Sequence, residues 1–307
     1  MNEDINKTII ALTGHANEII AGSYENVGKI FSLTDKDSNS AEIANLAESF
    51  GMMAIKVEAR EFALEKTIEE LKEKKARVES LVRLRTQFSF IFISTVLLTT
   101  VYIFLLGFLE TPYISELPNA DGIREYSSRG IEFITLIIVV LTIFTMRLPL
   151  KDFGLTTTGW KRAIIESLLV TVPVIAFLAF FKVMMNIYYP GIFKETQIFN
   201  IGYFGISYIV YLLVAPVQEF IARGTMQGSL TRLFSGRYSG LMGVLVTSFL
   251  FGSLHMCHSI HLSIAALLTS WLWGWMYQRQ KTIIGVSLSH FLVGNAAGLM
   301  GFWTFFS

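Results

Sequence analysis

Apolar and polar positions divide the chain into a charged first part and a strongly apolar remainder. Residues 4–33 carry apolar side chains three and four positions apart, which predicts one amphipathic helix. The polar run 34–40 ends this helix, and a second helix is predicted to begin near Ser40. Domain boundaries follow from this contrast: a helical head over residues 1–87 and a membrane domain over 88–307.

The second predicted helix carries an apolar seam that recurs every seven residues. Its members are Ile43, Phe50, Val57, Leu64, Leu71 and Val78. This period is typical of a coiled coil. We therefore expect a helical hairpin or coiled coil that pairs with a second copy of the chain, so that the protein is a homo-oligomer. The alternative is a solvated stalk that acts as a spacer.

Seven apolar stretches follow the head, each long enough to suggest a membrane-spanning helix. They lie near residues 88–109, 131–146, 163–181, 203–222, 240–256, 261–277 and 283–306. Backbone groups in lipid must be satisfied within the segment, which favours helices. The predicted fold is all-α: a polytopic membrane helix bundle of about seven spans, with a cytosolic helical hairpin or coiled coil at the amino terminus.

Composition supports a membrane protein, since 52% of the residues are hydrophobic and 25 are phenylalanine. The single cysteine, Cys257, excludes an intrachain disulfide. The first residues lack a basic region followed by an apolar run, so we expect no secretory signal.

Basic residues indicate the orientation of the predicted spans. They lie before the first span and after the second, fourth and sixth, which predicts a cytosolic amino terminus in a protein integral to the cytoplasmic (plasma) membrane. The basic residues between Lys72 and Arg85 suit anionic membrane lipids as partners. Acidic residues are interleaved with them, so no nucleic acid partner is expected.

Two charged residues lie in or beside the fourth apolar stretch, at Glu219 and Arg223. Four residues apart on a helix, they share one face and can pair. An unpaired charge at membrane depth costs about 2.5–3.5 kcal/mol on insertion scales, so such residues indicate a functional site by default. The alternative is an ion pair that only fixes one helix against its neighbours.

Other polar groups occur on two further predicted spans. His255 ends the fifth span, and His290 and Asn295 lie in the seventh. A carboxylate, imidazoles and an amide are the groups that activate a water and hold an oxyanion. Glu219 meets His255 at one depth if the fourth span continues past Arg223, or if the fifth is broken or shifted. The uncharged run 224–230 favours the first arrangement.

Three motifs in order resemble one family. Gln218-Glu-Phe-Ile-Ala-Arg223, then Phe251-x-x-x-His255, then His290 with a nearby asparagine resemble the CPBP family, the CAAX-processing and bacteriocin-processing (Abi) intramembrane proteases. The resemblance covers about residues 151–298. It implies an intramembrane endopeptidase acting on a peptide or lipidated peptide, in which a glutamate and a histidine activate water.

The resemblance also implies individual roles. His255 would be the partner base, while His290 and an asparagine would stabilise the oxyanion. Arg223 would orient the carboxylates of the motif, of which this chain has Glu219, with Gln218 at the other position.

Two positions depart from the family pattern. Gln218 stands where the family has the first, catalytic glutamate of Glu-Glu-x-x-x-Arg, and an amide cannot take a proton from water. Gly294 stands where the family has its asparagine, and Asn295 follows one position later; a local bulge at Gly294 would bring it back to His290. The alternative function is therefore a catalytically weakened member that binds a peptide or lipid and serves as a scaffold or signalling module.

Two further classes of protein, a zinc protein and a transporter, have less support in the sequence. His255, His258 and His261, together with Cys257, suggest a zinc site, for which a supporting carboxylate is not evident; the alternative is a polar turn. No other cofactor is expected, and His255 and His290 would hold a divalent metal if one is used. A transporter would need discontinuous helices and a polar pathway, for which Pro173 is the sole support.

Overall fold

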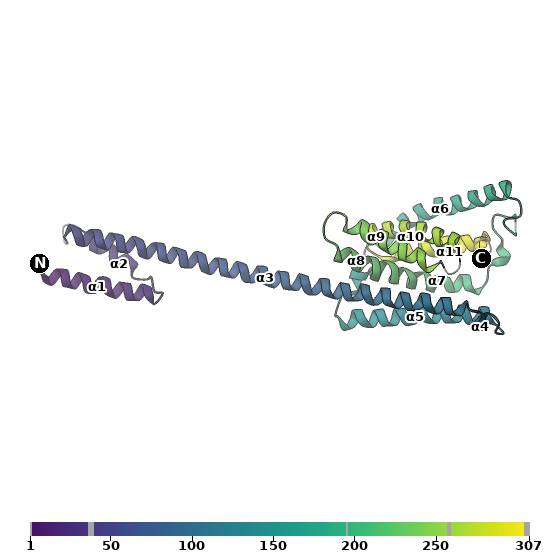
Figure 1. Ribbon diagram of the computed structural model, residues 1–307. Coiled ribbons are helices and arrows are strands. Elements are labelled where there is room, and N and C mark those ends of the chain that lie inside the picture. Colours follow the sequence, from purple (N-terminus) through teal and green to yellow (C-terminus); the bar gives the residue numbers. More distant parts are fainter. Residues whose placement is uncertain (1, 36–39, 195, 257–258, 304–307) are drawn as a thin grey trace. The chain divides into compact units, whose positions relative to one another are not determined.

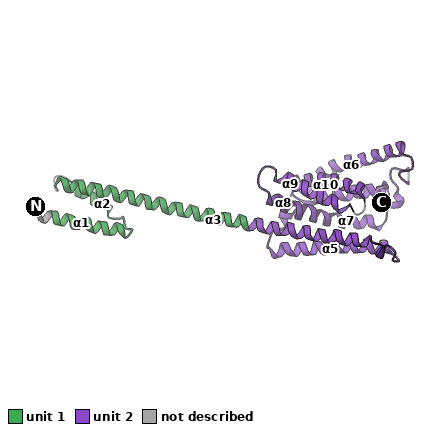
Figure 2. Ribbon diagram, in the orientation of Figure 1, with its two compact units in different colours: residues 1–82 green, residues 83–307 purple. Residues whose placement is uncertain are grey.

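The computed structural model describes residues 2–35, 40–194, 196–256 and 259–303. The chain divides into two compact units, residues 1–82 and 83–307 (Figure 2). Helices account for the regular structure of both units, and the described residues form no strand. The prediction of an all-α fold is confirmed.

The first unit contains α1 (Asn2–Ile20), α2 (Val27–Phe31) and the beginning of α3 (Ala41–Leu109). The prediction of one helix over residues 4–33 is wrong, because the chain turns between α1 and α2. Gly22 has a φ of 78° in this turn, a conformation that glycine adopts without a steric penalty. The turn folds α2 against α3, where Val27, Ile30, Ala47 and Ala54 form a small buried core.

The seven-residue seam of α3 changes its environment along the first unit. Near its start, Phe50 of the seam is half-buried and packs against the small core that contains Ala47 and Ala54. Farther along, Leu64 and Leu71 are 60% and 59% exposed. One continuous apolar seam is therefore covered at first and then uncovered.

The second unit begins within α3 and continues through eight helices and a π-helical segment. These are α4 (Pro112–Ser115), α5 (Ala120–Thr145), α6 (Trp160–Tyr188), α7 (Ile206–Glu219), the π-helical segment (Phe220–Gln227), α8 (Gly228–Leu233), α9 (Ser239–Leu254), α10 (Ile260–Gln280) and α11 (Ile283–Leu299) (Figure 1). Short 3-10 turns lie at Leu150–Phe153 and Ile201–Tyr203. α6 continues through Pro173, so this proline does not make α6 a discontinuous helix.

Helices occupy all seven stretches that were predicted to span a membrane. Four helical runs in the described residues are long and apolar enough to do so: Ala41–Leu109, Gly122–Thr145, Trp160–Tyr188 and Ile206–Leu233. Ser239–Leu254 and Ile283–Leu299 are apolar but shorter. The second unit is an integral membrane helix bundle.

The run Ile206–Leu233 places Glu219 near its middle, because α7, the π-helical segment and α8 follow one another without a break. The helix therefore continues past Arg223, as the uncharged run after it suggested. Gly224 makes this packing possible: a Cβ at this position would lie 2.4 Å from the carbonyl oxygen of Phe153. The interior around this run holds Phe251, Trp273 and Val286 from α9, α10 and α11.

Candidate active site

A buried ion pair lies at the junction of α7 and the π-helical segment. Arg223 Nε donates to Glu219 Oε2 at 2.9 Å, and both side chains are 0% exposed. Arg223 also donates to Ser270 Oγ at 2.7 Å and, more weakly, to Gln227 Oε1 at 3.4 Å. The pairing expected from the four-residue spacing is present, and α10 provides an additional partner through Ser270.

His290 of α11 joins this pair. Its Nδ1 lies 2.8 Å from Glu219 Oε1, and its Nε2 lies 2.9 Å from the hydroxyl of Tyr211. The imidazole stacks on the Trp273 ring with centroids 4.1 Å apart. Glu219 therefore has a cationic or N–H partner on each carboxylate oxygen, and His290 has a partner on each ring nitrogen.

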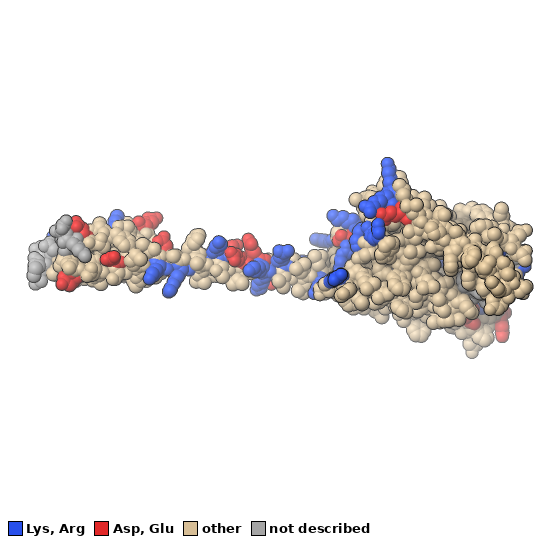
Figure 3. Space-filling model, turned by 90° about the horizontal axis from the view of Figure 1, so that it is seen from above, with Lys and Arg blue, Asp and Glu red and all other residues tan. Residues whose placement is uncertain are grey.

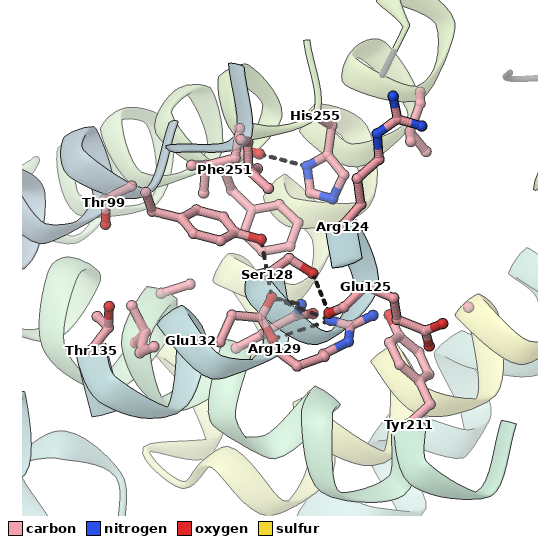
Figure 4. A pocket seen from close by; sticks show the side chains of 18 of the residues that line it. Thr99, Arg124, Glu125, Ser128, Arg129, Glu132, Thr135, Tyr211, Phe251 and His255 are labelled. Atoms are coloured by element: carbon pink, nitrogen blue, oxygen red, sulfur yellow. Dashed lines mark hydrogen bonds and ion pairs between the residues drawn. The ribbon is translucent and has the colours of Figure 1, made fainter. Parts of the chain in front are cut away.

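A cavity of about 680 Å³ lies beside this network. Gln218, His255 and Asn295 line it, and so does Tyr211, whereas Glu219 and His290 are buried and are not among its lining residues. Figure 4 shows His255 and Tyr211 on the wall of the cavity together with polar side chains of α5. Neighbouring residues 218 and 219 thus have different environments: one meets the cavity and the other meets the buried arginine.

His255 caps the carboxyl end of α9. Its Nδ1 lies 2.9 Å from the carbonyl oxygen of Phe251. A carbonyl can only accept, so Nδ1 carries the proton of this hydrogen bond and Nε2 is the basic nitrogen of the neutral ring.

Gln218 contacts a carboxylate from another helix. Its Nε2 donates to Glu132 Oε1 of α5 at 2.9 Å. Arg129 Nη1 donates to Glu132 Oε2 at 3.1 Å, and the Tyr102 hydroxyl lies 3.4 Å from Oε1. Glu132 was not predicted as a site residue from the sequence. Its signal was a carboxylate inside an apolar run, three residues after an arginine.

Asn295 and Gly294 take up different positions from those expected. α11 is helical through both residues, so the bulge at Gly294 that would bring Asn295 back to His290 is not present. Asn295 Nδ2 donates to the carbonyl oxygen of Tyr208 at 3.2 Å. A Cβ on Gly294 would lie 2.6 Å from the Tyr211 ring. The ring of Tyr211 therefore fills the space in which a side chain at position 294 would begin.

The residues do not fit a zinc site shared by His255 and His290, because both ring nitrogens of His290 already have protein partners. Within the part of the chain that the structure describes, no three histidine, cysteine, aspartate or glutamate side chains are grouped to hold a metal ion. Cys257 and His258, which belonged to the zinc hypothesis, lie outside the described residues.

The fold and the site together define a polytopic membrane protein with a buried Glu–Arg–His network beside a polar-lined cavity. Residues 200–295 match the family model described as type II CAAX prenyl endopeptidase Rce1-like. This match contains the six candidate site residues, and it supports the resemblance to the CPBP family. Searches of the curated proteins and of the solved structures found no match.

Proposed function

We propose that the protein is an intramembrane endopeptidase of the CPBP type, which hydrolyses a peptide bond with an activated water. The observation that carries this proposal is the meeting of His255, Gln218 and Tyr211 at one cavity within the helix bundle. His255 serves as a base through Nε2, because Nδ1 is held by the Phe251 carbonyl. An imidazole titrates near neutral pH, which suits proton transfer.

Glu219 and Arg223 act as positioning residues in this mechanism. They are fully buried, and Glu219 fixes the ring of His290 through Nδ1. In the arrangement that we propose, His290 donates through Nδ1 to Glu219 and through Nε2 to the oxygen of Tyr211. Tyr211 then keeps its own proton for the carbonyl oxygen of the substrate, since a phenol can accept one hydrogen bond and donate another.

The oxyanion role thus passes from His290 to the hydroxyl of Tyr211, with Asn295 farther along the same cavity wall. Removing one such donor typically costs about 10²–10³ in kcat. Tyr211→Phe is therefore expected to lower kcat by this amount, with a smaller effect on KM.

The substrate is a peptide or a lipidated peptide. Apolar side chains of the cavity, including Leu106, Ile221 and Leu262, can receive an apolar chain, while the polar groups meet the peptide bond. A volume of about 680 Å³ falls within the range of ligand sites. Membrane lipids contact the exposed apolar side chains of the bundle, such as Leu169 and Phe180 of α6.

The protein lies in the cytoplasmic membrane with its amino terminus in the cytosol. Figure 3 shows lysine and arginine side chains gathered at one end of the second unit. Exposed basic residues lie on several elements of this unit: Arg147 after α5, Arg232 in α8 and Arg279 near the end of α10. Their gathering at one end supports a cytosolic face.

The test is cleavage of fluorescence-quenched peptides by the purified protein in lipid vesicles, with and without a prenylated cysteine. We expect cleavage by the wild-type protein and a loss of about 10²–10⁴-fold in His255→Ala. His261→Ala, an exposed histidine that does not line the cavity, is the matched control. Binding of the peptide without cleavage would instead favour the catalytically weakened scaffold or signalling role, which the glutamine at position 218 makes the second candidate.

A second copy of the chain is the proposed partner of the exposed seam. Leu64, Leu71 and Val78 occupy one core position of the heptad, and all three are at least 58% exposed. Ile68 and Val82 occupy the other core position with Lys75 between them. Leucine at one position and β-branched residues at the other favour two parallel strands.

Charges flanking the seam support a parallel pairing. In a parallel register, Arg60 meets Glu65 of the partner subunit, and Lys74 meets Glu79 of the partner subunit. An antiparallel register would place Arg60 opposite Lys74 of the partner subunit, two like charges. The flanking residues therefore select the parallel dimer.

Disulfide trapping of the full-length protein in vesicles tests this partner. In a Cys257→Ser background, Leu64→Cys, Leu71→Cys and Val78→Cys should each form a cross-linked dimer, since facing core positions lie within disulfide reach only in the parallel register. Glu70→Cys, on the opposite face, is the control and should stay monomeric. Monomers at all three seam positions would contradict the dimer.

A further inference from the structure

We propose that Glu132 of α5 is the carboxylate that takes the proton from the attacking water. It replaces the first glutamate of the family motif, because position 218 of this chain is a glutamine. This inference rests on the proposed endopeptidase function. Three carboxylates line the cavity among the described residues: Glu110, Glu125 and Glu132. Of these, Glu132 is the one bonded to Gln218, at 2.9 Å.

Glu219 is poorly placed for this step. Its side chain is 0% exposed, and it does not line the cavity. Arg223 holds one of its oxygens and His290 holds the other. A water in the cavity does not meet Glu219, because this side chain is enclosed by the helices, and its present contacts hold His290 in place.

Glu132 has the geometry that a base needs. Its side chain is 11% exposed, so it is shielded and still reaches the cavity. Gln218 and Tyr102 bond to Oε1, while Arg129 is the described partner nearest Oε2, at 3.1 Å. An ionised carboxylate has about four acceptor sites, so Oε2 retains a lone pair for a water. Arg129 Nη1 also lies 3.3 Å from Oε1, so the carboxylate is held in place through both of its oxygens.

The contact with Gln218 explains why an amide is compatible with this site. Two carboxylates at hydrogen-bond distance would repel each other or share one proton. An amide at position 218 instead donates to Glu132 and fixes its direction. The carboxylate is thus provided by α5, outside residues 200–295, while the motif position provides the hydrogen bond that orients it.

The proposed reaction consumes one water. Glu132 accepts a proton from the water, while His255 Nε2, as the partner base, accepts a hydrogen bond from the water's other hydrogen. The resulting hydroxide oxygen forms a bond to the carbonyl carbon of the substrate. The carbonyl oxygen becomes an oxyanion that accepts a hydrogen bond from Tyr211. When the C–N bond breaks, the proton held by Glu132 passes to the leaving nitrogen, which restores the carboxylate and releases an acid and an amine.

The experiment compares Glu132→Gln with the wild-type protein in the peptide-cleavage assay, together with thermal unfolding. We expect kcat to fall by about 10²–10⁴-fold with KM and the unfolding temperature little changed, because the substitution keeps the shape and removes the base. Glu116→Gln is the matched control, an exposed carboxylate outside the cavity, and should keep full activity.

An exchange variant, Glu132→Gln with Gln218→Glu, moves the carboxylate to the other side of the same hydrogen bond. Its kcat should be at least about tenfold higher than that of Glu132→Gln alone, because a positioned base typically contributes about 10²–10⁴-fold. An active wild-type protein whose Glu132→Gln variant keeps more than a third of its kcat would overturn the role of Glu132. A folded exchange variant with no recovery would do the same. A wild-type protein that cleaves no peptide overturns the endopeptidase function itself, so the two failures are distinct.

Discussion

Arg223→Ala is expected to destabilise the membrane unit strongly. The substitution removes a guanidinium that is 0% exposed and that bonds to Glu219, Ser270 and Gln227. Glu219 is then left as a buried carboxylate with His290 as its neighbour. The unpaired buried charge of Glu219, more than the lost hydrogen bonds, accounts for the decrease in the free energy of unfolding.

The size of the effect follows from the burial of the pair. Removing one partner of a buried ion pair costs about 3–5 kcal/mol. For a domain of 150–250 residues each kcal/mol shifts the unfolding midpoint by about 2–4 °C, which gives a decrease of about 6–20 °C. Arg162→Ala is the matched control, because Arg162 also bonds to a glutamate four residues away, at 2.8 Å, but is 79% exposed. That exposed pair should contribute at most about 1 kcal/mol.

Thermal unfolding of the detergent-solubilised protein, followed by circular dichroism, measures both variants. The double variant Glu219→Gln with Arg223→Met should recover much of the lost stability, since it leaves no unpaired charge. If Arg223→Ala shifts the midpoint no more than Arg162→Ala does, the buried pair does not exist and the network around His290 must be rejected.

Two further predictions concern packing and orientation. Gly224→Ala should lower the free energy of unfolding by about 1–3 kcal/mol, because the added Cβ would clash with the Phe153 carbonyl oxygen. A Cβ at Gly107 meets nothing within 4 Å, so Gly107→Ala should be tolerated. Equal thermal unfolding midpoints for the two variants would contradict the tight contact at Gly224. Reporter fusions at Ser40 and Gly122 should read cytosolic and external respectively, and a cytosolic signal at Gly122 would overturn the proposed orientation.

Much of the fold could be predicted from the sequence because apolar length decides where helices cross lipid. The seven predicted stretches all became helices, and the four-residue spacing of Glu219 and Arg223 correctly indicated a pair. The turn at Gly22 was missed, since the apolar spacing of residues 4–33 continues across it. A periodic pattern does not reveal where the chain folds back on itself.

The arrangement of the site was less accessible from the sequence because it depends on contacts between distant helices. Glu132 lies 86 positions before its partner Gln218, so no local motif links them. The space beside His290 is filled by Tyr211, which a glycine at position 294 permits. The partners of Gln218 and Gly294 thus come from other helices, and a motif of consecutive residues does not contain them.

Hydrolysis in water enriched in ¹⁸O tests the central claim most directly. The purified protein in lipid vesicles is incubated with a membrane-embedded peptide, and the products are weighed by mass spectrometry. We expect two fragments, with one ¹⁸O atom in the newly formed carboxyl group, and the loss of both fragments in His255→Ala. Intact peptide that stays bound to a folded protein, or fragments that persist unchanged in His255→Ala, would contradict it.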